Sequence, residues 1–181
     1  MIIFFGPAGA GKSVQGQMLA AREEWKWLST GQMFRDSSDP EVQEILKTGE
    51  LISDETTYDV VRDSLANARE FDHLIVDGFP RTMNQAEWLM REQGDFAHEV
   101  KMVIVLEVPE SMIQDRLQLR GRAQDKPAIV ARRMSIYRKE MYPVLGYFAD
   151  KNIKVAHIDG TGSVGAVHDK IHAELEQSGL I

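Results

Sequence analysis

Short apolar runs recur along the chain, and longer stretches of mixed polar and apolar residues separate them. The clearest runs are Met1–Phe5, Leu74–Val76, Met102–Leu106 and Ile153–Ile158, and a weaker one lies at Trp27-Leu28. Continuous apolar runs of this length are typical of strands buried on both faces of a parallel sheet. Their alternation with helical stretches predicts an α/β fold, in which helices flank a parallel sheet of about five strands in three α/β/α layers.

The region from about residue 29 to about residue 69 is predicted to be a small helical insertion between strands. A polar turn leads into a short helix that carries Arg35, and Asp39-Pro40 suits the start of a second helix, which Gly49 ends. Ser53 is a candidate N-cap for a third helix with acidic residues in its first turn. Such an insertion is large enough to form a separate, mobile lobe.

Composition narrows the class of protein. With 181 residues and 43% apolar content, the chain is expected to form one domain with a packed core. The net charge of −7 argues against a general binder of nucleic acid or membrane surfaces, and the absence of cysteine excludes disulfides and thiolate zinc sites. Because no secretory signal and no apolar run of membrane-spanning length is visible, a cytoplasmic location is expected.

Positive charge is concentrated in one part of this acidic chain. Between Arg116 and Lys139 there are six arginines and two lysines, against only Asp115 and Asp125. A solvated helix face would explain such a run, but like charges this dense also suit a site for a strongly negative ligand. A nucleoside triphosphate is the obvious candidate, and two arginine-bearing helices joined by the polar residues 121–127 would then cover its site.

The stretch Gly6-Pro7-Ala8-Gly9-Ala10-Gly11-Lys12-Ser13 matches the P-loop pattern G-x-x-x-x-G-K-[ST], between an apolar strand and a helical stretch. Its glycines allow backbone N–H groups to surround phosphates, Lys12 would reach the β- and γ-phosphates, and the Ser13 hydroxyl would bind Mg²⁺. A glycine-rich turn without a ligand is disfavoured, because lysine, serine and both flanking elements are in place. The fold class is therefore that of the P-loop NTPases.

Asp77 directly follows the Leu74–Val76 run. The carboxyl ends of parallel strands meet at one edge of a sheet, so Asp77 and the P-loop are expected to be neighbours. A carboxylate there is placed to orient Mg²⁺ through its water shell, with a turn-capping aspartate as the alternative. Arg81 follows at the next turn, where a guanidinium can donate two hydrogen bonds to a phosphate.

Several motifs together resemble the adenylate kinases, which are nucleoside monophosphate kinases. The most specific are Asp77-Gly78-Phe79-Pro80-Arg81-Thr82 and Ser29-Thr30-Gly31, and the motifs span nearly the whole chain. The full set of resembling stretches is Gly6–Ser13, Leu28–Arg35, Gly49–Glu55, Asp77–Gln85, Arg116–Arg122, Arg133 and Ile158–Thr161.

The resemblance implies a single kinase domain, residues 1–181, that transfers a phosphoryl group from ATP to a nucleoside monophosphate with Mg²⁺ as cofactor. It also implies a monophosphate-binding lobe at about residues 29–60 and a lid at about residues 121–127, too short to need a structural zinc. The acceptor is expected to be AMP, because Thr30 and Gln85 fall where adenylate kinases contact the acceptor adenine. A monomer is expected, with neither nucleic acid nor membrane as a partner.

The resemblance further assigns residues to each role. The implied catalytic cations are Lys12, Arg81, Arg120, Arg122 and Arg133. The implied ATP contacts are Gly9, Ala10, Gly11, Lys12, Ser13, Val14, Arg116, Arg120 and Gly160. The implied AMP contacts are Thr30, Gly31, Arg35, Leu51, Ile52, Gly78, Arg81, Gln85, Arg122 and Arg133. The metal would be held by Ser13 and, through water, by Asp77.

The chemistry fits a site that is rich in arginine. Because the second pKa of a phosphate monoester is about 6, the acceptor is mostly a dianion at pH 7 and needs no general base. Catalysis would then rest on in-line positioning and on charge stabilisation. His168 and His172 lie four residues apart on the last predicted helix, and without a third ligand they are expected on a solvent face.

The chain departs from the family's usual pattern around the donor phosphates and in the lid. Ser13-Val14 replaces the usual Gly-Thr, so a threonine hydroxyl is lost near the α-phosphate, while Ala8 replaces a proline. Gln32 stands where an Asp is common, and Gln124 stands where the first of two lid acids is common. The loss of that lid acid weakens the expected hydrogen bonding of a closed lid. Two alternatives to an AMP kinase therefore stay open: a kinase for UMP or CMP, and a weakly catalytic nucleotide-binding sensor or assembly factor.

Overall fold

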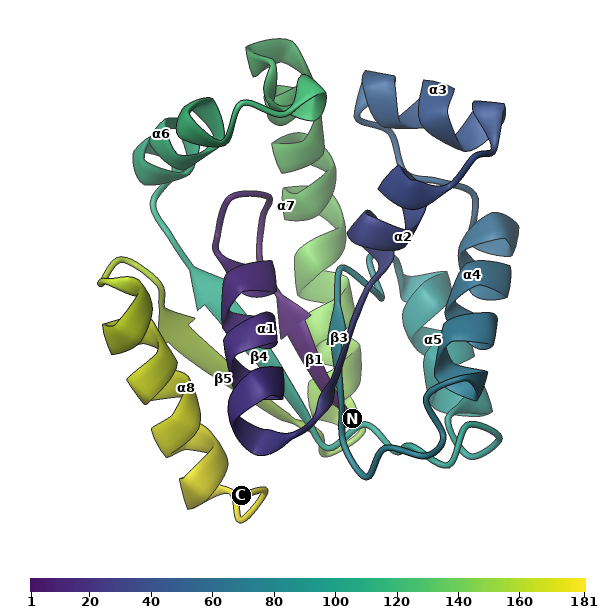
Figure 1. Cartoon of the computed structure of the whole chain (residues 1–181), viewed down its shortest axis with the longest axis vertical. Helices are drawn as coiled ribbons and strands as arrows, with labels where there is room; N and C mark the ends of the chain where they lie inside the picture. The colour runs from purple at the N-terminus through teal and green to yellow at the C-terminus, as the bar shows by residue number, and fades with distance from the viewer.

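A five-stranded parallel sheet forms the centre of the molecule in the computed structural model, which describes residues 1–181 (Figure 1). The strands are ordered β2-β3-β1-β4-β5, and every neighbouring pair is parallel. Their bounds are β1 Ile2–Phe5, β2 Lys26–Ser29, β3 Leu74–Asp77, β4 Met102–Glu107 and β5 Lys154–Asp159. Each predicted apolar run coincides with a strand to within one residue at either end, and the predicted fold class is confirmed.

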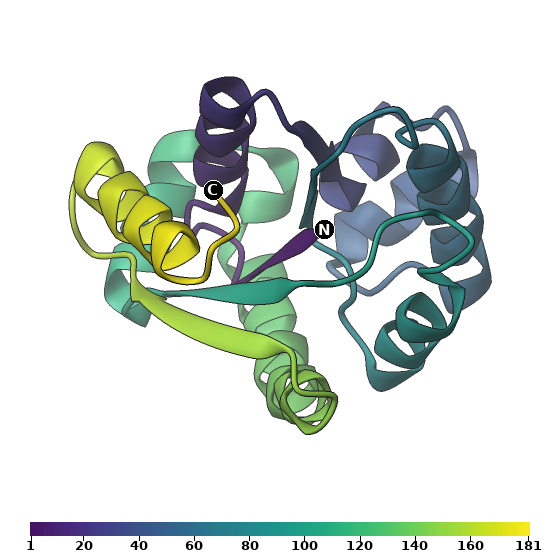
Figure 2. The same cartoon turned by 90° about the horizontal axis from the view of Figure 1, so that it is seen from below.

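Helices cover both faces of the sheet (Figure 2), which gives the three layers that the sequence predicted. On one face, Ile2 and Phe4 pack with residues of α1 (Lys12–Glu23) and α8 (Val164–Gln177). On the other, Ile3 and Phe5 pack with residues of α4 (Asp54–Ala66), α5 (Met83–Glu92) and α7 (Pro127–Asp150). Because β1 is buried on both sides, all four of its residues are apolar and buried.

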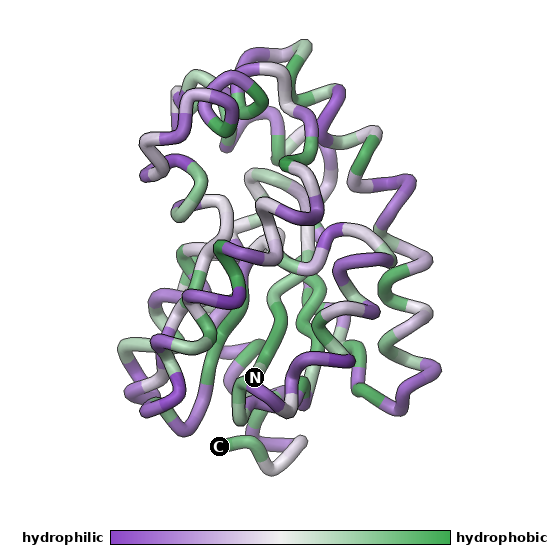
Figure 3. The backbone as a smooth tube through the Cα atoms, turned by 90° about the vertical axis from the view of Figure 1, so that its right-hand side faces the viewer, coloured by the Kyte–Doolittle hydropathy of each residue, from purple (hydrophilic) through white to green (hydrophobic).

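In Figure 3 the backbone is coloured by the hydropathy of each residue. Hydrophobic residues follow the inner strands, and hydrophilic residues predominate on the outer helices. No helix of this chain has both the length and the apolar character needed to cross a lipid bilayer.

Three helices lie between β2 and β3, as the capping residues predicted. They are α2 (Thr30–Asp36), α3 (Pro40–Thr48) and α4. The Asp39 side chain accepts a hydrogen bond from Glu41 N, Ser53 Oγ accepts one from Thr56 N, and Gly49 ends α3 with a φ of 78°. Phe34, Val42 and Ile52 form a small apolar cluster of their own, apart from those of the sheet.

The basic region forms two helices joined by a short connection. Helix α6 (Glu110–Arg120) ends at Gly121, a 3₁₀ turn, η1, spans Ala123–Asp125, and α7 begins at Pro127. Pro109 is the N-cap of α6. Ile113 and Leu117 of α6 pack on Val130 and Met134 of α7, so the two helices form one unit.

The predicted solvent face for His168 and His172 is wrong. His168 is only 5% exposed, because it packs at the interface between α8 and α1, where its Nδ1 lies 3.2 Å from Gln15 Oε1. His172 is half-buried, with its Nε2 3.3 Å from Glu23 Oε1. The apolar face of α8 is wide enough that position 168 turns inward, and a buried glutamine on α1 satisfies its imidazole.

Candidate active site

The P-loop joins β1 to α1 at the carboxyl edge of the sheet, and β3 ends beside it (Figure 1). Ser13 Oγ donates a hydrogen bond of 2.6 Å to Asp77 Oδ2, and Asp77 is only 3% exposed. The prediction that Asp77 and the P-loop are neighbours is therefore confirmed.

The P-loop backbone has a shape that requires glycine. Gly6, Gly9 and Gly11 have φ values of 143°, 87° and 101°. A Cβ at Gly6 would lie 2.9 Å from Leu106 O, and one at Gly9 would lie 3.0 Å from the Leu117 side chain. Larger residues at these positions would both strain the backbone and collide with the strand and helix alongside.

Lys12 lies at the start of α1 and curls back over the loop. Its Nζ donates hydrogen bonds of 2.7 Å to Gly6 O and 3.0 Å to Pro7 O. Burial lowers the pKa of Lys12 to about 8. Asp77 opposes this shift, whereas the positive charges of nearby arginines add to it. A negative ligand would relieve that repulsion.

Arg81 and Arg35 belong to different elements and are held near the same point. Arg81 Nε donates a 2.7 Å hydrogen bond to Gly78 O, and Arg35 Nη2 donates one of 2.7 Å to Gln32 Oε1. Burial lowers the pKa of both guanidinium groups. The amide oxygen of Gln32 thus anchors Arg35.

Arg133, in the first turns of α7, is the third arginine of this cluster. Burial, and to a smaller extent the charges of Arg81 and Arg120, lower the pKa of Arg133 to about 10. Arginines normally stay far above that value, so the low pKa reflects a buried guanidinium with other cations close by. Four cations, from the P-loop, an insertion helix, the loop after β3 and α7, therefore face one region, an arrangement that suits a polyphosphate.

One cavity extends from the P-loop into the helical insertion. Apolar side chains such as Phe34, Leu51 and Ile52 line it beside Thr30, whose Oγ1 donates a 2.9 Å hydrogen bond to Gly78 O. Ten of the predicted site residues line this single cavity: Lys12, Thr30, Gly31, Arg35, Leu51, Ile52, Gly78, Arg81, Gln85 and Arg133. A flat apolar group and a phosphate can therefore be held in the same cavity.

The amide of Gln85 is fixed at the wall of this cavity. Its Oε1 accepts a 2.8 Å hydrogen bond from Arg81 N, and its Nε2 donates one of 2.8 Å to Asp54 Oδ1. Sequence reasoning placed Asp54 only in the first turn of a helix and missed this contact. No local pattern reveals it, since the two residues are 31 positions apart.

The lid region is held together by Asp125. Both carboxylate oxygens accept from the Arg120 guanidinium, at 2.5 and 2.9 Å, and Oδ2 also accepts from Arg122 N at 3.1 Å. Arg133 Nη1 lies 4.0 Å from the same carboxylate. Burial opposes the charge of Asp125, but these hydrogen bonds and charges keep its pKa below its ordinary value.

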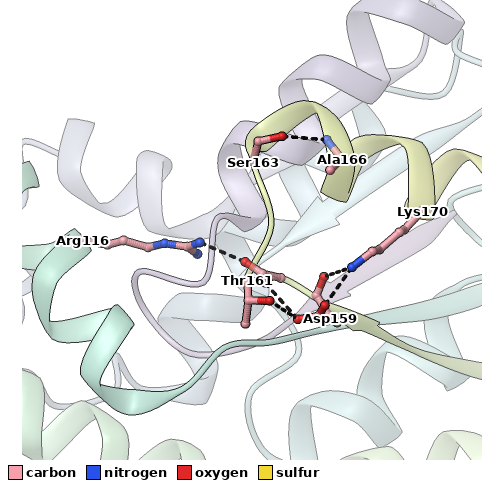
Figure 4. Close-up of polar contacts among 7 residues, drawn as sticks. Arg116, Asp159, Thr161, Ser163, Ala166 and Lys170 are labelled. Atoms are coloured by element: carbon pink, nitrogen blue, oxygen red, sulfur yellow. Dashed lines mark hydrogen bonds and ion pairs between the residues drawn. The ribbon is translucent and has the colours of Figure 1, made fainter.

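Arg116 lies at the other end of the site, beside the turn that follows β5 (Figure 4). Its Nη2 donates a 2.9 Å hydrogen bond to Gly160 O and its Nη1 one of 3.4 Å to Ala10 O, so Arg116 links α6 to the P-loop and to this turn. Asp159 orders the turn by accepting from Thr161 N at 3.0 Å and from Lys170 Nζ at 2.8 Å. The guanidinium is thus held by its edge.

The remaining predicted residues lie around this frame. Val14 is 47% exposed on α1, next to Ser13, and the P-loop residues between Gly9 and Ser13 form the turn into that helix.

Sequence reasoning also missed several side chains that line the cavity. They are Phe34, Glu50, Thr57, Ile136, Tyr137 and Met141, and they reach it only through the packing of α2, α4, α7 and the loop after α3.

A Mg²⁺ ion fits the chemistry of the Ser13 and Asp77 pair. Their oxygens are 2.6 Å apart, and hydroxyl and carboxylate oxygens are the hard ligands that Mg²⁺ prefers. No group of three or more His, Cys, Asp or Glu side chains gathers elsewhere as a metal cluster.

A P-loop, an acidic strand end and converging arginines define the class: a P-loop phosphotransferase that acts on nucleotides. Comparison with known proteins gives the family. The family model described as adenylate kinase matches residues 4–153. The chain therefore belongs to the adenylate kinase family, and its activity is that of a nucleoside monophosphate kinase.

Individual relatives cover nearly the whole chain. A protein of Thermus thermophilus named adenylate kinase is 34% identical, over 96% of this chain and 96% of its own length. Proteins of the same name from Synechococcus sp. and Deinococcus deserti are 31% and 35% identical; the first match covers 96% of this chain and 97% of the relative, and the second covers 94% of each.

Proposed function

We propose that this protein transfers the γ-phosphoryl group of ATP to AMP, reversibly, to give two ADP. The observation that carries the proposal is the single cavity that runs from Lys12 of the P-loop, past Arg81 and Arg133, to an apolar chamber beside Gln85. A donor triphosphate at the P-loop and an acceptor monophosphate in the chamber would both present phosphates to these cations.

The acceptor half of the site is proposed to be the chamber formed by the insertion, residues 29–60. Arg35 and Arg81 would bind the monophosphate, Thr30, Gly31 and Gly78 would lie alongside it, and Leu51 and Ile52 would pack on the base. AMP is favoured because Gln85 offers both a donor and an acceptor at the chamber wall. The relatives that match this chain are named adenylate kinases, which supports the same acceptor.

The donor half is proposed to lie over the P-loop. Backbone N–H groups between Gly9 and Val14 would surround the phosphates, with Lys12 paired to the β- and γ-phosphates. Arg116, held by its edge at Gly160 O, would present a guanidinium face on which the donor base can stack. Arg120, Arg122 and Arg133 would lie between the two nucleotides.

In the proposed reaction an oxygen of the AMP phosphate attacks the γ-phosphorus of ATP, and the bond from that phosphorus to the β–γ bridging oxygen breaks. The acceptor is already a dianion at pH 7, so the site needs no general base. Arg35 and Arg81 orient the attacking oxygen, while Lys12, Arg120, Arg122 and Arg133 stabilise charge on the transferred group. This explains why the site holds many cations and no histidine.

Ser13 and Asp77 are proposed to hold Mg²⁺, Asp77 through water. When bound, the ion would neutralise charge on the β- and γ-phosphates.

The short connection at residues 121–127 is proposed to act as a lid that closes over the phosphates and excludes water, the competing acceptor. A cytoplasmic location and the absence of nucleic-acid or membrane partners remain predictions from the sequence, and the monomer remains an implication of the family resemblance.

The test is a coupled assay of purified protein with Mg-ATP and, in turn, AMP, GMP, CMP and UMP. We expect AMP to be phosphorylated with the highest kcat/KM, and omission of Mg²⁺ to abolish turnover. Preference for CMP or UMP would replace the proposed acceptor, and turnover of none of them would overturn the proposed reaction.

A weakly catalytic nucleotide sensor is the second candidate, favoured by one observation. Val14, exposed beside the P-loop, has no hydroxyl to offer the α-phosphate. Binding of ATP and AMP in calorimetry without phosphoryl transfer would support this candidate over the kinase.

A further inference from the structure

The amide of Gln85 has only one orientation that its surroundings accept. Arg81 N carries a hydrogen, so the atom facing it at 2.8 Å must be an acceptor; the Asp54 carboxylate has none, so the atom facing it at 2.8 Å must be a donor. Rotating the amide by 180° would set an N–H against an N–H and an oxygen against a carboxylate oxygen. Both contacts would be repulsive, and Gln85 is only 3% exposed, so water could not relieve them.

The fixed orientation determines what the amide offers a ligand. After these two contacts, Nε2 has one N–H left to donate and Oε1 has one lone pair left to accept. Adenine presents the complementary pair on its edge: N1 accepts and the 6-amino group donates. Hypoxanthine has the opposite pair, because its N1 carries a hydrogen and its O6 accepts. An amide free to rotate would serve both bases, but one fixed as here serves only the first.

We propose that Asp54 is a positioning residue that makes the acceptor site select a 6-amino purine, by holding the Gln85 amide in one orientation. This role of Asp54 rests on the proposed function in one respect only: the acceptor base must lie at Gln85. Asp54 acts through Gln85 and does not itself have to touch the base. The second carboxylate oxygen of Asp54 accepts from Asn84 Nδ2 at 3.3 Å, so Asp54 is itself held from the start of α5.

Inosine monophosphate (IMP) is the probe that isolates this effect, since hypoxanthine differs from adenine at these two positions alone. The variant is Asp54→Asn, whose amide can turn to face either orientation of Gln85. Arg81 N still favours the original orientation, so the loss of selectivity is partial. We expect the ratio of kcat/KM for AMP to that for IMP to fall by about tenfold, through the KM for each acceptor, with kcat for AMP nearly unchanged.

Three further variants complete the design. Glu55→Gln removes the neighbouring, exposed carboxylate in the same helical turn and should keep the wild-type ratio. Asp54→Glu retains a carboxylate acceptor and should restore most of the selectivity. Asp54→Ser, whose hydroxyl donates or accepts, replaces Asp54→Asn if thermal denaturation shows that the latter does not fold.

The outcomes separate this inference from the proposed function. An unchanged AMP/IMP ratio in Asp54→Asn, an equal change in Glu55→Gln, or a wild-type protein that treats AMP and IMP alike overturns the role of Asp54 while AMP kinase activity stands. If no monophosphate is phosphorylated, the proposed reaction fails, and the ratio of AMP to IMP dissociation constants from calorimetry then decides on Asp54. Absence of binding to either nucleotide overturns both.

Discussion

Four cations of the site have pKa values below their ordinary range, and burial is the main cause for each. They are Lys12, Arg35, Arg81 and Arg133, and the charges of neighbouring arginines lower the values for Lys12, Arg35 and Arg133 further. Keeping such groups charged and close together costs free energy that a bound phosphate returns. The cations proposed to bind phosphate are therefore also those whose charge burial disfavours most.

The low pKa of Lys12 predicts that donor binding depends on pH. Lys12 binds phosphate only while protonated, so its contribution is complete below pH 8 and is lost as the pH rises above its pKa of about 8. The dissociation constant of ATP should rise by about tenfold per pH unit above this point. Calorimetry at pH values from 7 to 9.5 measures this dissociation constant. Lys12→Arg keeps its charge throughout and should give a flat profile, whereas a flat wild-type profile would contradict the assignment.

Arg81 should serve the acceptor and not the donor. Replacing it in Arg81→Ala removes charge-assisted hydrogen bonds to the monophosphate, and kcat/KM for AMP should fall by about 100-fold or more. The dissociation constant for ATP, measured by calorimetry, should stay nearly unchanged.

Arg91→Ala is the matched control for that change, because Arg91 is 65% exposed on the helix that follows Arg81 and pairs only with Glu92. It should leave both quantities unaltered. An equal loss of ATP affinity in Arg81→Ala would show that Arg81 belongs to the donor half.

At the scale of elements, the connection between α6 and α7 is ordered by one carboxylate. Asp125 accepts from Arg120 and from Arg122 N and lies 4.0 Å from Arg133, so a single residue sets the positions of arginines from both helices. Gln124, next to it, lines the cavity where the family commonly has an acid.

Neutralising this carboxylate should disturb catalysis more than folding. In Asp125→Asn, Arg120 and Arg133 lose their shared counter-charge and repel each other, so kcat should fall by about tenfold, while the free energy of unfolding changes by about 1 kcal/mol. Steady-state kinetics and urea denaturation measure the two effects. Asp115→Asn, an exposed carboxylate on α6, is the control and should change neither. A large loss of stability with normal kcat would make Asp125 a folding residue only.

At the scale of the whole molecule, the helical insertion and the lid side are in contact. The loop that ends α3 meets α7, where Arg132 forms an ion pair with Glu50, and α3 also contacts η1. A Cβ at Gly49 would lie 2.7 Å from Ile129 Cγ2. Gly49 and Glu50, which line the cavity, thus pack on residues of α7 that lie about 80 positions further along the chain.

Adding a Cβ at position 49 should weaken the packing between this loop and α7. Gly49→Ala meets Ile129 and must also adopt a φ of 78°, so it should destabilise the fold by about 1–2 kcal/mol and raise KM for AMP, with little effect on KM for ATP. Thermal denaturation and kinetics measure both. Gly94→Ala is the control, since a Cβ there has open space. An unchanged KM for AMP would show that the contact of Gly49 with α7 plays no part in binding the acceptor.

Much of the fold was predictable because the relevant signals are local. Apolar runs gave all five strands, Ser53 and Gly49 marked helix ends by the way their own atoms cap or turn the backbone, and the P-loop pattern places Lys12 and Ser13 within one turn. The meeting of Asp77 with Ser13 followed from parallel strands alone, since their carboxyl ends share an edge.

The sequence by itself thus determined the α/β fold, the phosphate-binding loop and which cations gather near it. Only the tertiary structure decided the partners of side chains whose contacts cross elements: His168 turning inward onto Gln15, Asp125 holding Arg120, and Asp54 fixing Gln85. The physical reason is distance along the chain. Backbone conformation depends on neighbouring residues, but a hydrogen bond between residues 31 positions apart exists only once the packing of helices and sheet has brought them together.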